Sequence, residues 1–438
     1  MSRKISSKIL ILLTVLLGGT FSAGAQEAFG GYSPYSIFGV GDMAVQGTAY
    51  NKAMGGVGIA GRNHRYLNIM NPAAVTARDS LSFMASFSMN VNNKIFRQGG
   101  AISANNVANV NDVVISFPIQ RASAMMIGIV PYSDMGFQFG GQYDDPNIVG
   151  NAGDVSYSAS GIGSMYKLFA AAGVTFLKRI SIGAELDYYF GNLSKSFTTN
   201  FSDGSYSSIS NTNILQLNGI GGKFGLQYEQ PVGENLKMTV GATYSTGSEL
   251  KGYYERGSFS VGSATTDTLS HRIDTMGLTK HASLAGEIGV GISLKKENKW
   301  MVEFNYTRSD WRDSGVEGIS GYNLSSIPFS TTVSEAYRAG FEYIPNISDI
   351  RYYMNRVAYR VGAYYRKDYY KLSGHDIASM GITLGATFPV FRMYNGLSVG
   401  VEFGQRASLS GNLTRERYIN FSVGINIFDI WFQKPQYE

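Results

Sequence analysis

The chain has 438 residues, a formal net charge of +5 and no cysteine. The lack of cysteine excludes disulfides, thiolate metal sites and cysteine nucleophiles. Glycine is frequent at 53 residues, and charged residues make up only 16%. That composition argues against disorder and suits a chain built of many strands, which as a closed sheet can use this whole length as one domain.

The first 25 residues have the features of a secretory signal peptide. Its basic residues are Arg3, Lys4 and Lys8. The apolar run 9–17 is too short to span a bilayer, which argues against an uncleaved anchor helix. The small residues Ala23-Gly24-Ala25 predict cleavage before Gln26. Cleavage removes three basic residues and no acid, so the net charge falls to +5 − 3 = +2, which gives no argument for nucleic acid.

After residue 25 no stretch holds about 18 consecutive apolar residues, so a membrane helix is not predicted. Apolar and polar residues instead alternate with period 2, as in the run from Ile419 to Ile427. This alternation predicts strands near 81–91, 110–119, 123–133, 165–178, 180–190, 213–229, 236–246, 281–294, 299–308, 334–343, 356–367, 378–388, 397–406 and 416–427. The number is even, as single-chain bacterial barrels require.

Alternating faces also fit a soluble sandwich, and two features favour a membrane barrel. The polar face is rich in glycine and carries both signs of charge, as at Glu185, Glu303 and Arg360, which suits a wet or salt-bridged lumen. The connections alternate between short turns, as at 178–179 and 295–298, and longer loops at 140–151, 191–212, 247–280, 309–332 and 405–415. We therefore expect an all-β transmembrane antiparallel barrel of about 14 strands over residues 81–428, in the bacterial outer membrane, with a periplasmic tail at 429–438.

Residues 26–80 do not resemble strands. They contain many glycines and the turn Asn71-Pro72. About fourteen strands enclose a lumen wide enough to need filling, so we expect this segment to lie inside as a hatch. The lumen charges are then expected to pair with one another and with hatch residues such as Arg62, Arg65 and Arg78. A periplasmic arm is the alternative, but the segment is too apolar for a solvated linker.

Two short motifs carry a family resemblance. Ala53-Met54-Gly55-Gly56-Val57-Gly58 is followed by Asn71-Pro72-Ala73-Ala74, and the first long strand begins directly afterwards. These motifs resemble the FadL-type family of outer-membrane proteins, which transport long-chain fatty acids or aromatic hydrocarbons. The resemblance implies a hatch formed around Gly55, Gly56, Gly58, Asn71 and Pro72. The segments 32–39 and 431–434 look like a branch of this family found in Bacteroidota.

The resemblance implies passive uptake of hydrophobic small molecules, by lateral diffusion through the barrel wall into the membrane lipid. Gly161 and Gly163 are candidates for the strand kink that such a route uses, since glycine permits a bend. The chain departs from the family in two ways. The carboxylate-binding basic residues of fatty acid transporters cannot be placed in this sequence residue by residue, and ten residues follow Phe428. The alternative is a non-transporting subunit of an outer-membrane secretion or assembly complex, with other envelope proteins as partners.

Motifs for chemistry are weak. Residues 56–61 match a dinucleotide-binding glycine pattern, but no strand precedes them and no helix follows. His281 and Ser283 are expected to share the lumen face with Glu287, without a third member of a catalytic triad. The histidines lack metal-ligand spacing, and the acidic pair Asp144-Asp145 is more typical of a solvated loop tip than of a calcium site. We therefore expect no enzyme activity, no cofactor and no metal.

Overall fold

The computed structural model describes residues 30–79, 82–143, 149–150, 153–203, 205–262, 265–319, 328–390, 395–408 and 413–430. The predicted signal peptide, the acidic pair at 144–145 and most of the C-terminal tail lie outside the described residues. Within them, no helix has the length and apolar character needed to cross a membrane.

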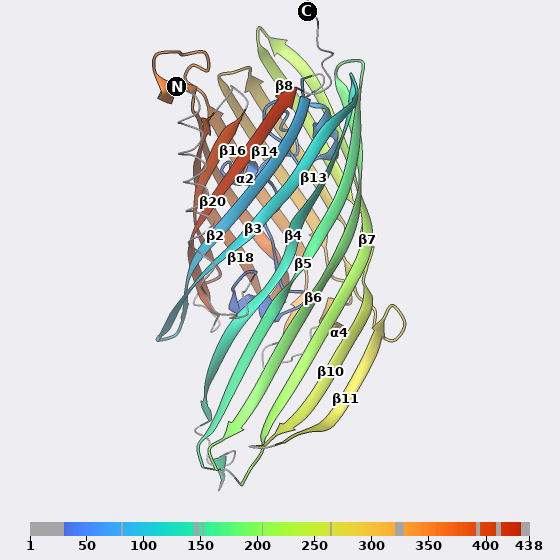
Figure 1. The fold of residues 1–438 in the computed structure, drawn as a ribbon, viewed down its shortest axis with the longest axis vertical. Coiled ribbons are helices and arrows are strands. Elements are labelled where there is room, and N and C mark those ends of the chain that lie inside the picture. The colour runs from blue at the N-terminus through green and yellow to red at the C-terminus, as the bar shows by residue number, and fades with distance from the viewer. Residues whose placement is uncertain are drawn as a thin grey trace, which may run out of the picture.

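Fourteen strands close into one antiparallel barrel, as the sequence predicts (Figure 1). Its strands are β2 (Ser82–Gln98), β3 (Ala101–Gln120), β4 (Ser123–Tyr143), β5 (Val155–Phe176), β6 (Ile180–Phe201), β7 (Ser208–Gly233), β8 (Leu236–Ser245), β13 (Glu287–Lys296), β14 (Trp300–Asp310), β16 (Val333–Tyr343), β17 (Ala358–Leu372), β18 (His375–Pro389), β19 (Gly396–Arg406) and β20 (Arg415–Ile430). The first and last of these strands pair from Ser82↔Ile430 to Arg97↔Arg415, which closes the sheet and leaves no edge there.

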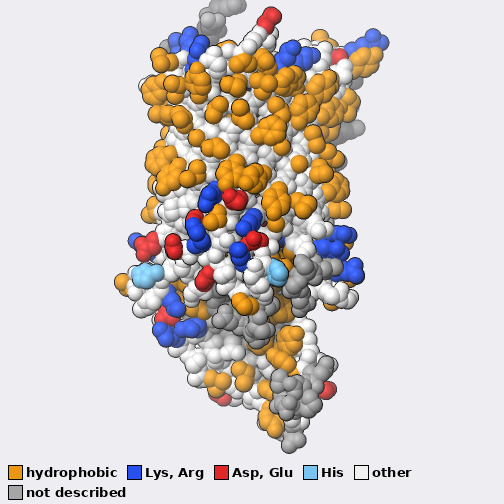
Figure 2. All heavy atoms as spheres, turned by 180° about the vertical axis from the view of Figure 1, so that it is seen from behind, with side chains coloured by type: hydrophobic (Ala, Val, Ile, Leu, Met, Phe, Trp, Pro, Cys, Tyr) orange, Lys and Arg blue, Asp and Glu red, His pale blue; other side chains and the backbone are white. Residues whose placement is uncertain are grey.

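The outward face of the barrel is apolar. On β20 the side chains of Phe421, Val423 and Ile425 remain 39%, 43% and 44% exposed, whereas inward-facing Glu185 and Glu303 are buried. Figure 2 shows the resulting apolar belt around one face of the barrel. Lipid is the solvent that such a belt requires, so the barrel spans the outer membrane.

Several strands are far longer than the membrane requires. About ten residues cross a bilayer in a tilted strand, yet β5 and β6 have 22 residues each and β7 has 26. Their outer halves continue as a sheet beyond the belt, which is extended by β10 (Lys251–Val261) and β11 (Thr266–Met276) (Figure 1). This sheet lies at the end of the barrel opposite the short turns.

The predicted loops 191–212 and 247–280 are therefore wrong in large part. Residues 191–201 and 208–212 continue β6 and β7, and β10 and β11 form most of the second region. These stretches are rich in Ser, Thr and Asn, so their alternation is weak in the sequence. Pairing across the sheet satisfies their backbone groups and fixes them as strands.

The wall has a seam between β3 and β4, where the two strands diverge toward the outer end (Figure 1). They pair only from Val113↔Ile129 to Gln120↔Ser123. Beyond that point β3 pairs with β2, and among the described residues no strand pairs with its other edge. Just beyond that point, Ser133 and Asp134 of β4 pair with β1 (Asp42–Met43), a strand of the N-terminal segment.

The N-terminal segment, residues 30–79, contains β1 and three short helices. These are η1 (Pro34–Ile37), α2 (Ala49–Lys52) and η2 (Pro72–Thr76). The remaining short elements are β9 (Ser248–Glu249), β12 (Ser283–Leu284), α4 (Val316–Ile319), β15 (Phe329–Thr331) and η3 (Tyr353–Arg356). The segment contacts inward-facing groups of strands all around the barrel, so it occupies the lumen.

Candidate functional site: the barrel lumen

Glycines on the inner face of the wall lie directly against the N-terminal segment. A Cβ added at Gly340 would lie 2.5 Å from the Met54 carbonyl oxygen, and one at Gly424 would lie 2.7 Å from Ala49 Cβ. A Cβ added at Gly362 would overlap the backbone of Gly55. Gly183, Gly225, Gly241 and Gly385 meet other parts of the segment in the same way. The inward glycines thus give room to the packed N-terminal segment, whereas the sequence pattern related them to a wet or salt-bridged lumen.

The predicted hatch glycines lie at the centre of this packing. Gly55 has φ +72° and Gly56 φ +76°, a backbone region that favours glycine. The Gly55 N–H donates to Thr383 Oγ1 at 2.8 Å, which fixes the turn to β18. A Cβ at Gly58 would lie 2.7 Å from Met70 Cγ, so this position also requires the smallest residue.

The predicted turn at Asn71 and Pro72 begins η2. Asn71 Oδ1 accepts from the Ala73 N–H at 3.0 Å, and Asn71 Nδ2 donates to the Ile59 carbonyl at 2.8 Å. Pro72 occupies the first helical turn, where a missing N–H costs nothing. These contacts join two stretches of the segment and press them against β6 and β7.

Polar contacts fasten the same region to the wall. Glu303 of β14 accepts from the Ala60 and Gly61 N–H groups at 2.9 and 3.1 Å. Arg62 forms an ion pair with Glu229 at 3.7 Å and donates to Gln227 Oε1 at 2.9 Å. The expected pairing of hatch arginines with lumen acids therefore holds for Arg62.

The other two predicted arginines bind different groups. Arg78 donates to the Val75 and Ser82 carbonyls. Arg65 donates to Asn298 Oδ1. Both contacts are to neutral oxygens, which the charge pattern of the sequence does not reveal.

Arg406 of β19 holds the outer part of the segment. Its guanidinium lies 3.0 Å from Asp42 Oδ1 and 2.6 Å from Asp368 Oδ2, and its centre is 5.0 Å from the Tyr35 ring. Glu416 of β20 lies 3.8 Å away and accepts from Ser33 Oγ. One buried cation thus joins the segment to β17, β19 and β20.

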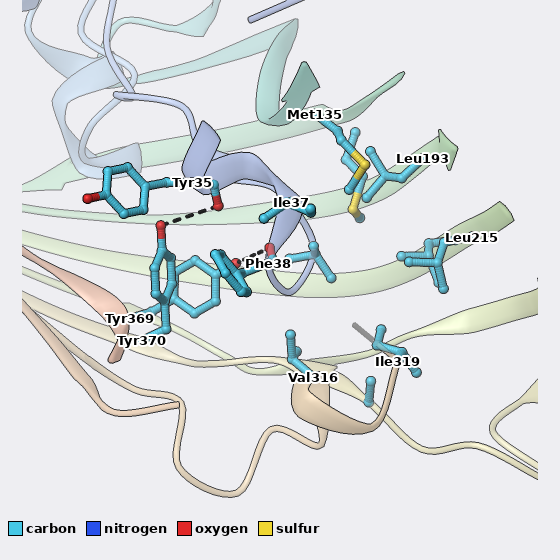
Figure 3. Close-up of a cluster of buried hydrophobic side chains, with 14 of the residues drawn as sticks. Tyr35, Ile37, Phe38, Met135, Leu193, Leu215, Val316, Ile319, Tyr369 and Tyr370 are labelled. Atoms are coloured by element: carbon cyan, nitrogen blue, oxygen red, sulfur yellow. Dashed lines mark hydrogen bonds between the residues drawn. The ribbon is translucent and has the colours of Figure 1, made fainter. Parts of the chain in front are cut away.

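The outer end of the lumen is filled by a hydrophobic cluster (Figure 3). Phe38 and Ile37 of the segment meet Tyr369 and Tyr370 of β17, whose rings lie 4.8 Å apart edge to face. Other members come from α4 and from β4, β6 and β7: Val316, Ile319, Met135, Leu193 and Leu215. The aromatic pattern of β17 signals this cluster in the sequence, but its partners come from distant parts of the chain.

Among the described residues, two cavities of about 150 and 170 Å³ are both lined by residues 42–45. Their shared lining includes Arg338, Arg366 and Arg406. Charged side chains line both cavities. A hydrophobic molecule entering either one would displace the water around those charges without offering them hydrogen bonds, which is unfavourable.

A third hollow, about 690 Å³ in volume, lies on the lipid-facing side of β13, β14, β16 and β17. Its wall is aromatic and aliphatic: Val290, Ile292, Phe304, Tyr306, Tyr337 and Tyr365. Since this hollow faces outward within the apolar belt, membrane lipid fills it.

The predicted kink residues lie in β5, which stays paired along both edges. Gly163 has φ +131°, and a Cβ there would overlap the Asn192 carbonyl. The residue pairs with Met135 of β4 and Leu193 of β6 without a break. A lateral opening at this point would require those pairs to separate.

The register instead shifts in β4, between Pro131 and Ser133. Tyr132 is the extra residue, and its side chain lines the second cavity. The Pro131 residue inside an otherwise strand-like run is the signal in the sequence that marks this irregularity.

His281 and Ser283 do not share the lumen face with Glu287. The expected strand 281–294 is interrupted, because Ser283 belongs to β12 and Glu287 begins β13. His281 is exposed, whereas Glu287 lines the second cavity. The interruption breaks the alternation from which the shared face was predicted.

Residues 1–438 match the model of the BamG family. The chain belongs to the BamG family. No curated protein matches it.

Solved structures share the fold of this BamG-family chain. The P. putida toluene transporter TodX has a TM-score of 0.58 and 14% identity over 88% of this chain and 99% of its own. The CymD monoaromatic hydrocarbon channel has a TM-score of 0.53 and 13% identity over 87% and 97%. A Pseudomonas aeruginosa FadL homologue has a TM-score of 0.52 and 13% identity over 88% and 98%. The resemblance to FadL-type proteins is therefore confirmed for the fold, and the Bacteroidota branch stays a prediction.

Proposed function

We propose that this chain is a non-transporting subunit of an outer-membrane assembly or secretion complex, with residues 30–79 as its fixed plug. The observation that carries the proposal is the match to the BamG family over the whole chain. The family name points to outer-membrane assembly, and fold alone does not decide function. This reverses the order that the sequence motifs favoured, in which uptake came first.

The lumen supports the proposal. The N-terminal segment is hydrogen-bonded to the wall, its outer end is packed into the hydrophobic cluster, and the two cavities beside residues 42–45 are lined by charged side chains. An uptake channel needs an apolar binding site connected to the outside. The large sheet of β5–β7, β10 and β11 offers an ordered surface outside the membrane for contact with partners.

The second candidate function is passive uptake of hydrophobic molecules by lateral diffusion, and the seam between β3 and β4 favours it. The seam begins beyond Val113 and Ile129, within the outer part of the apolar belt. A hydrophobic molecule passing there would have to displace residues 30–46 from β4. Both candidates are non-enzymatic, which agrees with the likeness to channels.

Native mass spectrometry of the gently extracted protein tests the proposal. A purification tag inserted between Gly99 and Gly100 avoids contacts, since nothing lies within 4 Å of an added Cβ at either residue. We expect a stoichiometric complex with other envelope proteins and no bound hydrophobic compound. A monomer that carries such a compound would overturn the proposal in favour of uptake.

A reversible cross-link separates the two functions in cells. Met43 and Ser133 are paired neighbours in β1 and β4, so M43C/S133C is expected to form a disulfide in a chain without native cysteine. Uptake past the seam would stop on oxidation and return on reduction, whereas a role as assembly subunit would be unaffected. M43C alone is the control.

A further inference from the structure

Three arginines are grouped on the outward face where β2 and β20 end. Arg97 and Arg415 are directly opposite each other, and Arg417 lies two residues further along β20, opposite Ile95. Directly opposed residues and residues two apart on one strand share a face. That face is the outer one, because Glu416 between the two β20 arginines is completely buried on the inner side.

The described residues place no acidic side chain in an ion pair with Arg97, Arg415 or Arg417. Arg417 Nε donates to the neutral Gln405 Oε1 at 3.3 Å, and Arg415 Nε is buried without a hydrogen-bond acceptor. The sequence 409–412 in the neighbouring loop contains no Asp or Glu. Like charges directly opposite each other destabilise a sheet, so this arrangement calls for an external anion.

Two other exposed arginines at the outer end of the barrel, Arg272 and Arg312, are paired. Arg312 forms an ion pair with Asp310, and Arg272 lies 2.9 Å from Asp274. The three grouped arginines therefore differ from Arg272 and Arg312 by the lack of an acidic partner.

The group lies directly above the apolar belt. Ile95 and Ile419 are 54% and 44% exposed and adjoin Arg417 on the same face. This is the end of the barrel away from the short turns, so the arginines lie at the level of the outer-leaflet headgroups. A ligand at this position needs an anionic head beside the arginines and acyl chains along the isoleucines.

We propose that Arg97, Arg415 and Arg417 form a binding site for the phosphate groups of an outer-leaflet glycolipid of the lipid A type. Guanidinium groups bind phosphate oxygens through paired, charge-assisted hydrogen bonds. The acyl chains lie on Ile95 and Ile419. The site lies outside the lumen and goes beyond the proposed function, because a lipid can be bound by either an assembly subunit or a channel.

The test measures retention of purified lipid A by the full-length protein in detergent, using native mass spectrometry. The wild type is expected to retain phosphorylated lipid A at least about tenfold better than its dephosphorylated form, since charge-assisted bonds of this kind typically reach that difference. R97Q/R415Q/R417Q is expected to lose this preference. R417Q, which changes one exposed residue, is the second variant in case the triple variant does not fold, and is expected to show a partial loss.

R272Q is the matched control, because it removes the same charge from an arginine that has an acidic partner. It is expected to retain lipid A as the wild type does. Equal retention of the phosphorylated and dephosphorylated forms, or an equal loss in R272Q, would overturn the proposal. Inorganic phosphate that displaces lipid A at equal concentration would also overturn it, because the site would then be one for free phosphate.

Discussion

Single glycines determine how closely the N-terminal segment approaches the barrel wall. The distance from wall to segment at Gly340, Gly362 and Gly385 is too small for any side chain. In each case the group that an added Cβ would meet belongs to residues 53–55, where backbone and short side chains have little freedom to move. The inner glycines are therefore part of the packing that holds the lumen closed.

Substitution of Gly362 by Ala is expected to destabilise the folded barrel by about 1–3 kcal/mol, the usual cost of overpacking. The added methyl would overlap backbone atoms of Met54 and Gly55, which cannot rotate away. Urea unfolding in detergent, followed by the heat-dependent shift in gel migration, measures the change. G100A is the control and is expected to change stability by less than about 0.5 kcal/mol; equal midpoints for the two variants would contradict the close packing.

Asp42 makes the attachment of the segment dependent on pH. Burial by itself would raise the pKa of Asp42, but the nearby Arg406 and Lys94 outweigh burial and hold the pKa below its usual value. A carboxyl with a depressed folded pKa stabilises the fold above its unfolded pKa of about 3.9, and loses that contribution as the pH falls through the folded pKa.

The stability difference between wild type and D42N is therefore expected to be constant near neutral pH and to disappear in strong acid. Urea unfolding midpoints measured between neutral pH and strong acid give this difference directly. A difference that grows on acidification would contradict the assigned role of the ion pair with Arg406.

At the scale of elements, the barrel and its outer sheet separate at β7. The inner half of β7 pairs with β8, and the outer half pairs with β10. β8 also pairs directly with β13, from Ser245↔Glu287 to Leu236↔Lys296. Barrel closure thus runs through β8 and β13, while β10 and β11 only extend the sheet.

Replacing residues 251–276 with a short Gly-Ser linker is expected to leave a closed barrel, because none of the pairs between β8 and β13 involves them. Heat-dependent gel migration and protease resistance of the membrane part check this. A deletion of β13 is the contrasting variant and is expected to prevent folding. Loss of the folded form in the linker variant would show that the outer sheet is needed for closure.

At the scale of the whole molecule, the closed lumen predicts a barrel that does not conduct ions steadily. R406Q would leave Asp42, Asp368 and Glu416 close together without their shared cation, which strongly disfavours the closed arrangement. In planar bilayers the wild type is expected to show no lasting open state, and R406Q to show intermittent openings. Steady conductance of the wild type would contradict a fixed plug.

The sequence by itself determined the barrel, its strand number and its apolar belt. These follow from the period-2 alternation, because each membrane strand must present one face to lipid whatever its neighbours are. The glycines and the Asn71-Pro72 turn also identified the N-terminal segment as non-strand in the sequence. A positive φ and a helix start each depend on the residue at that position rather than on distant contacts.

The tertiary structure alone decided what lies opposite each inner side chain. The sequence does not show that Gly362 faces Gly55, or that Arg406 joins Asp42 to Asp368. It also does not show that β1 of the N-terminal segment, rather than β3, pairs with β4 at Ser133 and Asp134. Except for Arg406 and Asp368, the residues in each of these contacts are separated by about 90 to more than 360 positions in the chain. The alternation of apolar and polar residues predicts which face of the wall a residue occupies. Its contact partner depends on how the barrel closes around the N-terminal segment.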